Sequence, residues 1–198
     1  HGLGQQLLQK QFYEGQPTEL VSEAIDKAKN DLNQIDQQIK SIRDLITEDI
    51  KKGDFQTVNL RKLFEEEILP NHNDSNRNFK ISLEIGPKCE ALIHKHSFIE
   101  SMRNMILNAQ VHGFKNKDFI YNIHFSAKRN RGRVVIDYKN NGLPLPKETT
   151  SKNLLSYGVK SVDSPGDGLG MAYVGKMIKA HRGSFEIIDD PDSSVHFK

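Results

Sequence analysis

The chain has 198 residues, of which 36% are hydrophobic, so it can hold one well-packed domain and a small appendage. Its 28 basic and 26 acidic side chains leave a formal net charge of +2, which indicates neither a nucleic-acid-binding surface nor an acidic tail. The single cysteine, Cys89, fits a reducing compartment, and no apolar run approaches the roughly 18 residues that a membrane helix needs. We therefore expect a cytoplasmic segment that makes no membrane contact itself, although the full-length protein can be anchored in a membrane upstream.

A heptad pattern of apolar residues marks the N-terminal part of the chain. From Val21 onward, the apolar positions are spaced alternately by four and three residues: Ile25, Ala28, Leu32, Ile35, Ile39, Ile42, Ile46 and Ile50. The segment Lys51-Lys-Gly53 follows with two cations and a glycine, which are typical of a helix C-terminus. This pattern predicts one long helix.

A shorter amphipathic stretch precedes this helix, and Glu14-Gly-Gln-Pro-Thr18 separates the two with turn and helix-start residues. The apolar residues of the stretch are Leu3, Leu7, Leu8 and Phe12. Residues 1–53 are therefore predicted to form an antiparallel helical hairpin. Because a hairpin alone leaves so long an apolar seam uncovered, a second copy is expected to complete a four-helix bundle. A coiled-coil linker without chemistry of its own is the alternative interpretation.

Residues 54–198 follow a different pattern, in which helical periods of about 3.6 residues alternate with strand periods of about two. Helices are predicted over Val58–Leu69, Ser97–His112 and Leu169–His181, and strands over Phe79–Ile85, Ile120–Ala127, Arg133–Tyr138 and Ser184–Ile188. This order of elements indicates an α+β sandwich with helices on one face of a mixed sheet.

Two asparagines lie four residues apart in the predicted helix 97–112, so Asn104 and Asn108 project from the same side of it. An asparagine oxygen is a hard, neutral ligand that can complete the coordination of Mg²⁺ beside phosphate oxygens and water. Taken alone, the pair is also compatible with an ordinary solvated helix face.

The segment Asn140-Asn-Gly142 ends the predicted strand 133–138. Gly142 permits close approach of the backbone to a ligand, and Asn140 can accept a hydrogen bond from an adenine amino group. An ordinary Asn-Gly turn explains the same residues.

A glycine-rich loop, Gly166-Asp-Gly168-Leu169-Gly170, comes directly before a predicted amphipathic helix. Free backbone amides and the helix dipole at such a place favour a phosphate. Glycine loops also serve as flexible hinges, but the helix directly behind this one favours the phosphate interpretation.

The order of these three motifs, together with the following segment Met171–Gly183, resembles the ATP-binding catalytic domain of sensor histidine kinases. That domain shares the Bergerat fold with gyrase, Hsp90 and mismatch-repair ATPases. The resemblance covers roughly residues 58–198, and the hairpin matches the family's dimerisation and phosphoacceptor region. It implies ATP and Mg²⁺ as cofactors, a homodimer formed through residues 1–53, a catalytic domain over residues 54–198, and a response regulator as partner.

The resemblance assigns roles to the asparagines. Asn108 matches the family's metal-chelating asparagine, and Asn104 the first position of the same box. Relatives that hydrolyse ATP have a glutamate at that first position, whereas an asparagine does not act as a general base. Transfer of the phosphoryl group is therefore expected rather than net hydrolysis. Asn140 stands where the family has the aspartate that reads the adenine amino group.

Further positions match the family's nucleotide contacts. Tyr157 and Gly158 stand at its aromatic-glycine lid motif, and Pro144 replaces a glycine of the Asn140 box. The usual cation after the asparagine box is absent at Val111, so the candidates for phosphate contact are His112 and Lys115. The loop glycines and Leu169 complete the expected set of nucleotide-binding residues.

The phosphoacceptor is expected on the first helix of the hairpin. His1 is the only histidine before residue 72, and the spacing of the apolar residues after it resembles the family's acceptor box. Imidazole suits this role because it is nucleophilic when neutral. The acidic residue that usually follows the acceptor is Gly2 in this chain.

The sequence therefore predicts a histidine kinase core that phosphorylates itself from ATP and passes the group to an aspartate of a response regulator. The alternative is a degenerate kinase that senses nucleotide as a dimeric scaffold without phosphotransfer, motivated by Gly2, Asn140 and Pro144. An ATPase of the gyrase or Hsp90 type is disfavoured by Asn104.

Overall fold

The computed structural model describes residues 24–30, 32, 33, 35, 50, 54–70, 78–116, 118–156 and 169–198. The chain divides into two compact units, residues 1–42 and 43–198. Among the described residues of both units, none of the helices combines the length and the apolar character needed to cross a bilayer.

In the first unit, residues 24–30 are helical, as the heptad pattern predicts. The seam residues Ile25, Leu32 and Ile35 expose 49%, 62% and 49% of their surface. An exposed apolar seam is what a bundle with a second copy requires. The rest of the predicted hairpin lies outside the described residues, so the hairpin, its bundle and a boundary at residue 53 stay predictions.

The second unit combines strands and helices in one mixed fold. Its elements in chain order are β1 (Phe55–Asn59), α3 (Leu60–Leu63), the π-helical turn η2 (Phe64–Ile68), β2 (Phe79–Ile85), β3 (Glu90–His94), α4 (Lys95–Asn108), the π-helical turn η4 (Ala109–Gly113), β4 (Tyr121–Asn130), β5 (Arg133–Asn140), α5 (Ser151–Leu154), α6 (Leu169–Ala180) and β6 (Val195–Phe197). The predicted α+β class is confirmed for this unit.

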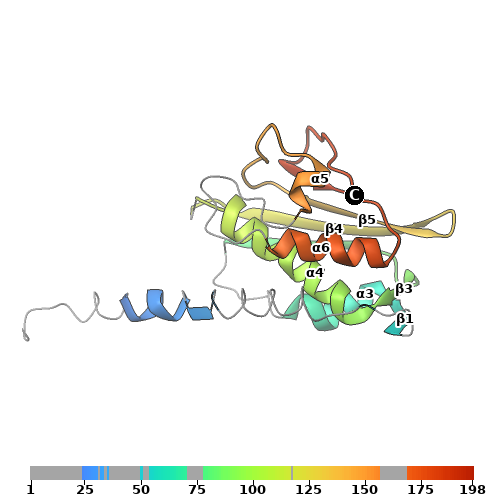
Figure 1. Ribbon diagram of the computed structural model, residues 1–198. Helices are drawn as coiled ribbons and strands as arrows, with labels where there is room; N and C mark the ends of the chain where they lie inside the picture. The colour runs from blue at the N-terminus through green and yellow to red at the C-terminus, as the bar shows by residue number, and fades with distance from the viewer. Residues whose placement is uncertain are drawn as a thin grey trace, which may run out of the picture. The chain divides into compact units, whose positions relative to one another are not determined.

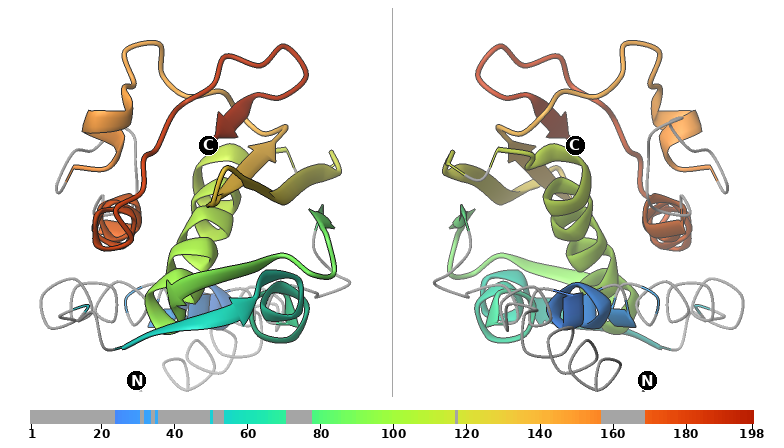
Figure 2. Two further views of the ribbon diagram at one scale, coloured as in Figure 1. Left: turned by 90° about the vertical axis from the view of Figure 1, so that its right-hand side faces the viewer. Right: turned by 90° about the vertical axis from the view of Figure 1, so that its left-hand side faces the viewer.

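The main sheet has four strands in the order β2-β4-β5-β6. β2 pairs with β4 in parallel, and the other two pairings are antiparallel, so the sheet is mixed as predicted. β1 and β3 form a separate antiparallel pair, which Figure 2 shows at the N-terminal end of α4.

The helices cover one face of the main sheet, as Figure 1 shows for α4 and α6 beside β4 and β5. In β4, Ile123 and Phe125 are fully buried on this face, while His124 between them is more exposed. Phe64 of η2 packs its ring 4.9 Å from that of Phe125. A single core between sheet and helices follows from this alternation.

The helix α4 carries the asparagine pair. The side chain of His94 caps it by accepting a hydrogen bond from the amide of Ser97, and the chain continues beyond Asn108 into η4. The predicted apolar face, which includes Phe98, Met102 and Ile106, is buried. The predicted helix 97–112 is therefore confirmed, with a start two residues earlier and a π-helical end.

Two sequence predictions about elements are wrong. Val58 lies in strand β1, because Asn59 starts the helix only at Leu60 by capping the amide of Lys62. Ser184–Ile188 forms no regular strand and contributes only an isolated bridge between Ile187 and Phe197 of β6. The short strands β1, β3 and β6 depend on partners distant in sequence, which local periodicity does not register.

Candidate nucleotide-binding site

The structure brings the asparagine pair and the end of the glycine loop together. A Cβ atom placed on Gly170 would lie 3.3 Å from the Oδ1 atom of Asn104 and 3.6 Å from the Nδ2 atom of Asn108. A methyl group at position 170 would therefore require a small shift of the Asn104 side chain, and a larger side chain would crowd both asparagines. We call the meeting of Asn104, Asn108 and Gly170 the asparagine–glycine contact.

Packing between α4 and α6 positions this contact. The two helices lie side by side on the sheet (Figure 1). α6 contributes Met171, Val174 and Met177 to the core that also contains Met102 and Met105 of α4. Because both helices are anchored by apolar residues along their length, the start of α6 is fixed against the asparagine side of α4.

Asn108 has a polar atom that the fold does not use. Its Nδ2 atom is buried and has no hydrogen-bond partner among the described residues. A half-turn of the amide about its terminal bond exchanges nitrogen and oxygen, so the same position can present the oxygen that Mg²⁺ prefers. Within the described ranges, no group of three or more His, Cys, Asp or Glu side chains could hold a metal. An Asn108 oxygen could serve as one ligand of a Mg²⁺ ion whose other ligands are phosphate oxygens and water.

The second motif forms what we call the Asn140 corner, made of Asn140, Gly142, Tyr138 and Gly113. Asn140 is only 6% exposed. Its Oδ1 atom accepts a hydrogen bond from the Gly142 amide at 3.0 Å, and its Nδ2 atom donates one to the Tyr138 hydroxyl at 3.1 Å. Burial raises the pKa of Tyr138, and its hydroxyl donates to the carbonyl oxygen of Met105 at 3.3 Å. The side chain of Asn140 is thus held by the fold itself.

Two glycines make the close backbone approach at this corner. A Cβ atom on Gly142 would lie 3.0 Å from both the carbonyl carbon and the oxygen of Gly113. The amide of Leu143 donates to the same Gly113 oxygen at 3.0 Å. Any side chain at position 142 would therefore clash with the backbone of η4 at Gly113, so this position needs glycine. The sequence reading did not single out Gly113 or Tyr138, because their roles depend on this tertiary contact.

The predicted phosphate contacts His112 and Lys115 lie at the end of η4. Desolvation lowers the pKa of the half-buried His112, and the charge of Lys115 lowers it further. The exposed Lys115 donates from Nζ to the carbonyl oxygen of Val111 at 2.5 Å. His112 is accordingly a neutral ring at cellular pH, and Lys115 is the cation beside it.

The remaining predicted residues divide into two groups. Leu169 is 5% exposed and buried at the start of α6. The phosphoacceptor candidate, the lid pair and two loop glycines lie outside the described residues: His1, Tyr157, Gly158, Gly166 and Gly168. Their roles stay predictions.

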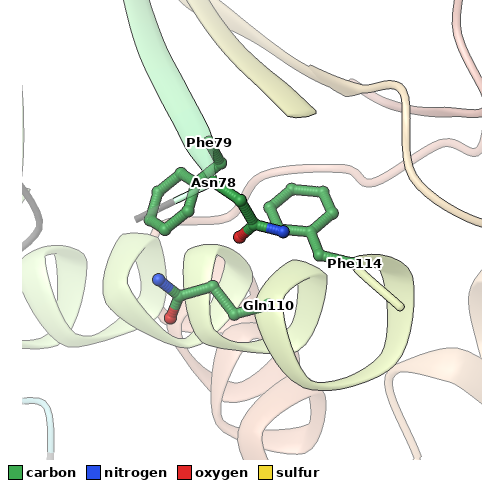
Figure 3. A pocket seen from close by; sticks show the side chains of 4 residues that line it. All are labelled: Asn78, Phe79, Gln110 and Phe114. Carbon is green, nitrogen blue, oxygen red and sulfur yellow. The ribbon is translucent and has the colours of Figure 1, made fainter. Parts of the chain in front are cut away.

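A separate cavity of about 220 Å³ lies between the start of β2 and η4. Figure 3 shows its lining, with Asn78 and Phe79 on one side and Gln110 and Phe114 on the other. Among the described residues, none of the predicted site residues lines it, and no motif in the sequence indicates it. The cavity is therefore a feature distinct from both the asparagine–glycine contact and the Asn140 corner.

Comparison with known proteins places the fold. No family model matches the sequence. A segment of 70 residues, 35% of the chain, is 39% identical to the nitrogen regulation protein NtrY of Azorhizobium caulinodans, and the match spans only 9% of NtrY. The catalytic domain of the histidine kinase ThkA aligns over 72% of this chain and 91% of its own length, with a TM-score of 0.59 and 20% identity.

The histidine kinase AdeS of Acinetobacter baumannii aligns over 97% of this chain and 89% of its own length, with a TM-score of 0.62 and 13% identity. At such identities the likeness shows the fold alone. The second unit has the fold of the catalytic, ATP-binding domain of histidine kinases.

Proposed function

We propose that the chain is the core of a sensor histidine kinase, which binds ATP with Mg²⁺, phosphorylates itself on a histidine and passes the group to an aspartate of a response regulator. The observation that carries the proposal is the asparagine–glycine contact, where Gly170 packs against Asn104 and Asn108. Two motifs far apart in sequence meet there, and a buried amide of Asn108 is left for a ligand. The fold shared with histidine kinase catalytic domains supports it.

Each residue of the contact has a distinct task in this proposal. Asn108 holds the metal, and the backbone amides at the start of α6 bind the phosphate chain. A bound Mg²⁺ ion would neutralise part of the negative charge on the transferring phosphoryl group. Asn104 is neutral and does not activate water, so the phosphoryl group is kept for the histidine.

His1 is the proposed acceptor. A neutral imidazole nitrogen attacks the γ-phosphorus, an N–P bond forms, the bond to the β,γ-bridging oxygen breaks, and ADP leaves. The chain is proposed to act as a homodimer through residues 1–53, supported by the exposed seam residues Ile25, Leu32 and Ile35. A cytoplasmic location follows from this function.

The test is incubation with γ-labelled ATP and Mg²⁺, followed by a search for protein-bound label that is lost in acid and retained in alkali. We expect label in the parent and in the controls His96→Ala and Asn130→Ala, both exposed positions. Label should be absent from His1→Ala and from Asn108→Ala. Label that persists in His1→Ala would remove His1 as the acceptor, and released phosphate without label would favour an ATPase.

A dimeric scaffold that senses nucleotide without phosphotransfer is the second candidate. It is favoured by the Asn140 corner, because Asn140 already bonds to Gly142 and Tyr138 within the fold. Binding of ATP without any acid-labile label would support this function in place of the kinase.

A further inference from the structure

We propose that His181, the residue directly after α6, is a proton-sensitive latch. Its neutral imidazole ring holds the end of α6 against the start of α4 and against β1 and β3, and protonation of the ring releases this end. The latch lies apart from the candidate nucleotide site and works whether or not a nucleotide is bound.

The two hydrogen bonds of the His181 ring fix its tautomer. The backbone amide of His94 lies 3.0 Å from Nε2 and can only donate, so Nε2 carries the lone pair. The carbonyl oxygen of Met177 lies 2.7 Å from Nδ1 and can only accept, so Nδ1 carries the proton. A protonated ring has N–H groups at both positions. Protonation would therefore set the Nε2 proton against the His94 amide and break that bond.

His94 is the point at which three other elements meet. It is the last residue of β3, it stands opposite Phe55 of β1, and its side chain caps α4 at the amide of Ser97. The ring of Phe55 also packs 4.8 Å from the ring of His181. The latch therefore joins the end of α6 to β1, to β3 and to the start of α4.

The backbone at the end of α6 keeps the ring in place. The amide of His181 donates to the same Met177 oxygen at 3.0 Å, and the amide of Gly183 donates to the carbonyl oxygen of Ile178 at 2.9 Å. Between them, Arg182 has a φ angle of 52°, which is typical of the residue that closes a helix. The helix thus ends in a closed turn, with the ring bonded back to its last full turn.

The latch holds the end of the α4–α6 pair that lies away from the asparagine–glycine contact. Asn108 ends α4 and Gly170 lies at the start of α6, whereas His94 precedes α4 and His181 follows α6. The two helices therefore run antiparallel, with a polar contact at each end. Opening the latch would free one end of α6 while the core and the asparagine–glycine contact still hold the rest.

The elements around the ring carry few negative charges that could stabilise an imidazolium. Their titratable or charged residues are Asp54 before β1, His94 and Lys95 where β3 meets α4, and Lys179 and Arg182 around the end of α6. Asp54 is exposed, and Lys95 is paired with Glu67 at 2.7 Å. The charges nearest in the chain to His94 and His181 are thus cations, which favour a neutral ring.

The direction of the pKa shift agrees with this geometry. Burial lowers the pKa of His181, the hydrogen bond to Met177 raises it, and repulsion from His94 lowers it, so that it lies below 6.5. The latch is therefore closed at neutral pH. Opening becomes easier as the pH falls below 6.5, because the released ring binds a proton that the latched ring excludes.

The experiment follows the full chain by NMR at pH 7 and pH 5. The ring nitrogen resonances of His181 report its tautomer, and we expect the neutral form with the proton on Nδ1 at pH 7. Hydrogen exchange of the His94 amide, corrected for the intrinsic pH dependence of exchange, reports opening. The opening equilibrium constant should rise by about fivefold or more between pH 7 and pH 5.

Two variants separate the proton from the packing of the ring. His181→Gln keeps an acceptor for the His94 amide and does not titrate, so opening should change by less than about twofold between the two pH values. His181→Phe keeps a ring beside Phe55 but offers no acceptor, so the His94 amide should exchange faster than in the parent at both pH values. His96→Gln is the matched control, because it removes an exposed histidine two residues from His94 and should keep the response of the parent.

Three outcomes would overturn the proposal. One is a His181 ring that carries a proton on Nε2 at pH 7, and another is opening in the parent that is equal at pH 7 and pH 5. The third is a response in His181→Gln as large as in the parent, which would assign the pH dependence to the ring of His94. The tautomer measurement needs no variant, so it decides the question even where a substitution prevents folding.

Discussion

The asparagine–glycine contact and the Asn140 corner both place asparagines beside glycines, but they treat the polar atoms differently. At the contact, the Nδ2 atom of Asn108 is buried without a partner among the described residues. At the corner, both polar atoms of Asn140 are bonded to Tyr138 and Gly142. A buried unpaired amide costs stability, whereas a paired one holds the fold together. The contact therefore leaves a polar atom for the proposed ligand, whereas the polar atoms of the corner hold the fold together.

The largest expected effect concerns the contact. Gly170→Val should weaken ATP binding by about 100-fold or more, which is about 2.7 kcal/mol, because its side chain would displace Asn104 and Asn108. Isothermal titration calorimetry measures the affinity, and thermal unfolding of the same variant shows that it is folded. An affinity within threefold of the parent would contradict the role of the contact.

Gly142→Ala should lower the free energy of unfolding by about 2 kcal/mol, because the added Cβ atom would lie 3.0 Å from the backbone of Gly113. Urea unfolding followed by circular dichroism measures it. Gly86→Ala is the control, since nothing lies within 4 Å of a Cβ atom placed there. Equal losses of stability for Gly142→Ala and Gly86→Ala would show that the corner does not depend on the close contact between the backbones of Gly142 and Gly113.

The same substitution made in both regions sharpens the comparison. Asn140→Leu should cost about 1–2 kcal/mol of stability, since it leaves the Gly142 amide without its acceptor and removes the bond to Tyr138. Asn108→Leu should change stability by no more than about 0.5 kcal/mol, because the replaced Nδ2 atom has no partner to lose. Chemical denaturation measures both. If Asn108→Leu lost more stability than Asn140→Leu, the distinction between the contact and the corner would be wrong.

The smallest expected effect is a pH dependence of the free energy of unfolding. It comes from His112, which lies in the chain between Asn108 of the contact and Gly113 of the corner. Burial lowers the pKa of His112 below 6.5, so below that value the unfolded chain binds a proton that the folded chain does not. Stability from this group is complete above pH 6.5 and falls as the pH drops toward the folded pKa. His112→Gln should flatten this part of the stability curve, measured between pH 8 and pH 5. An unchanged slope would assign the dependence to other groups.

Much of the fold follows from periodicity in the sequence. β2 begins at Phe79 and ends at Ile85 as predicted, because its alternation is complete, and α4 and α6 follow from their apolar faces. β4 and β5 are joined by a two-residue turn at Arg131 and Gly132, which have positive φ angles of 47° and 82°. The short strands were missed because their pairing is long-range.

The sequence motifs predicted which residues belong to the candidate site, but they did not predict which residues of the fold hold them in place. The resemblance to histidine kinase catalytic domains implied that Asn104, Asn108 and the glycine loop share a site, and the structure places both asparagines beside Gly170. No local pattern shows that Tyr138 and Gly113 hold Asn140 and Gly142, since these contacts form only when β5 meets η4.

The most direct test of the account follows the backbone and side-chain amide resonances of the chain by NMR during titration with Mg²⁺ and a non-hydrolysable ATP analogue. We predict that the largest shifts fall on the side-chain amide of Asn108 and the backbone amide of Gly170. They should be absent from Gly170→Val. Shifts confined to the cavity lined by Asn78 and Gln110, with Asn108 unmoved, would contradict the account.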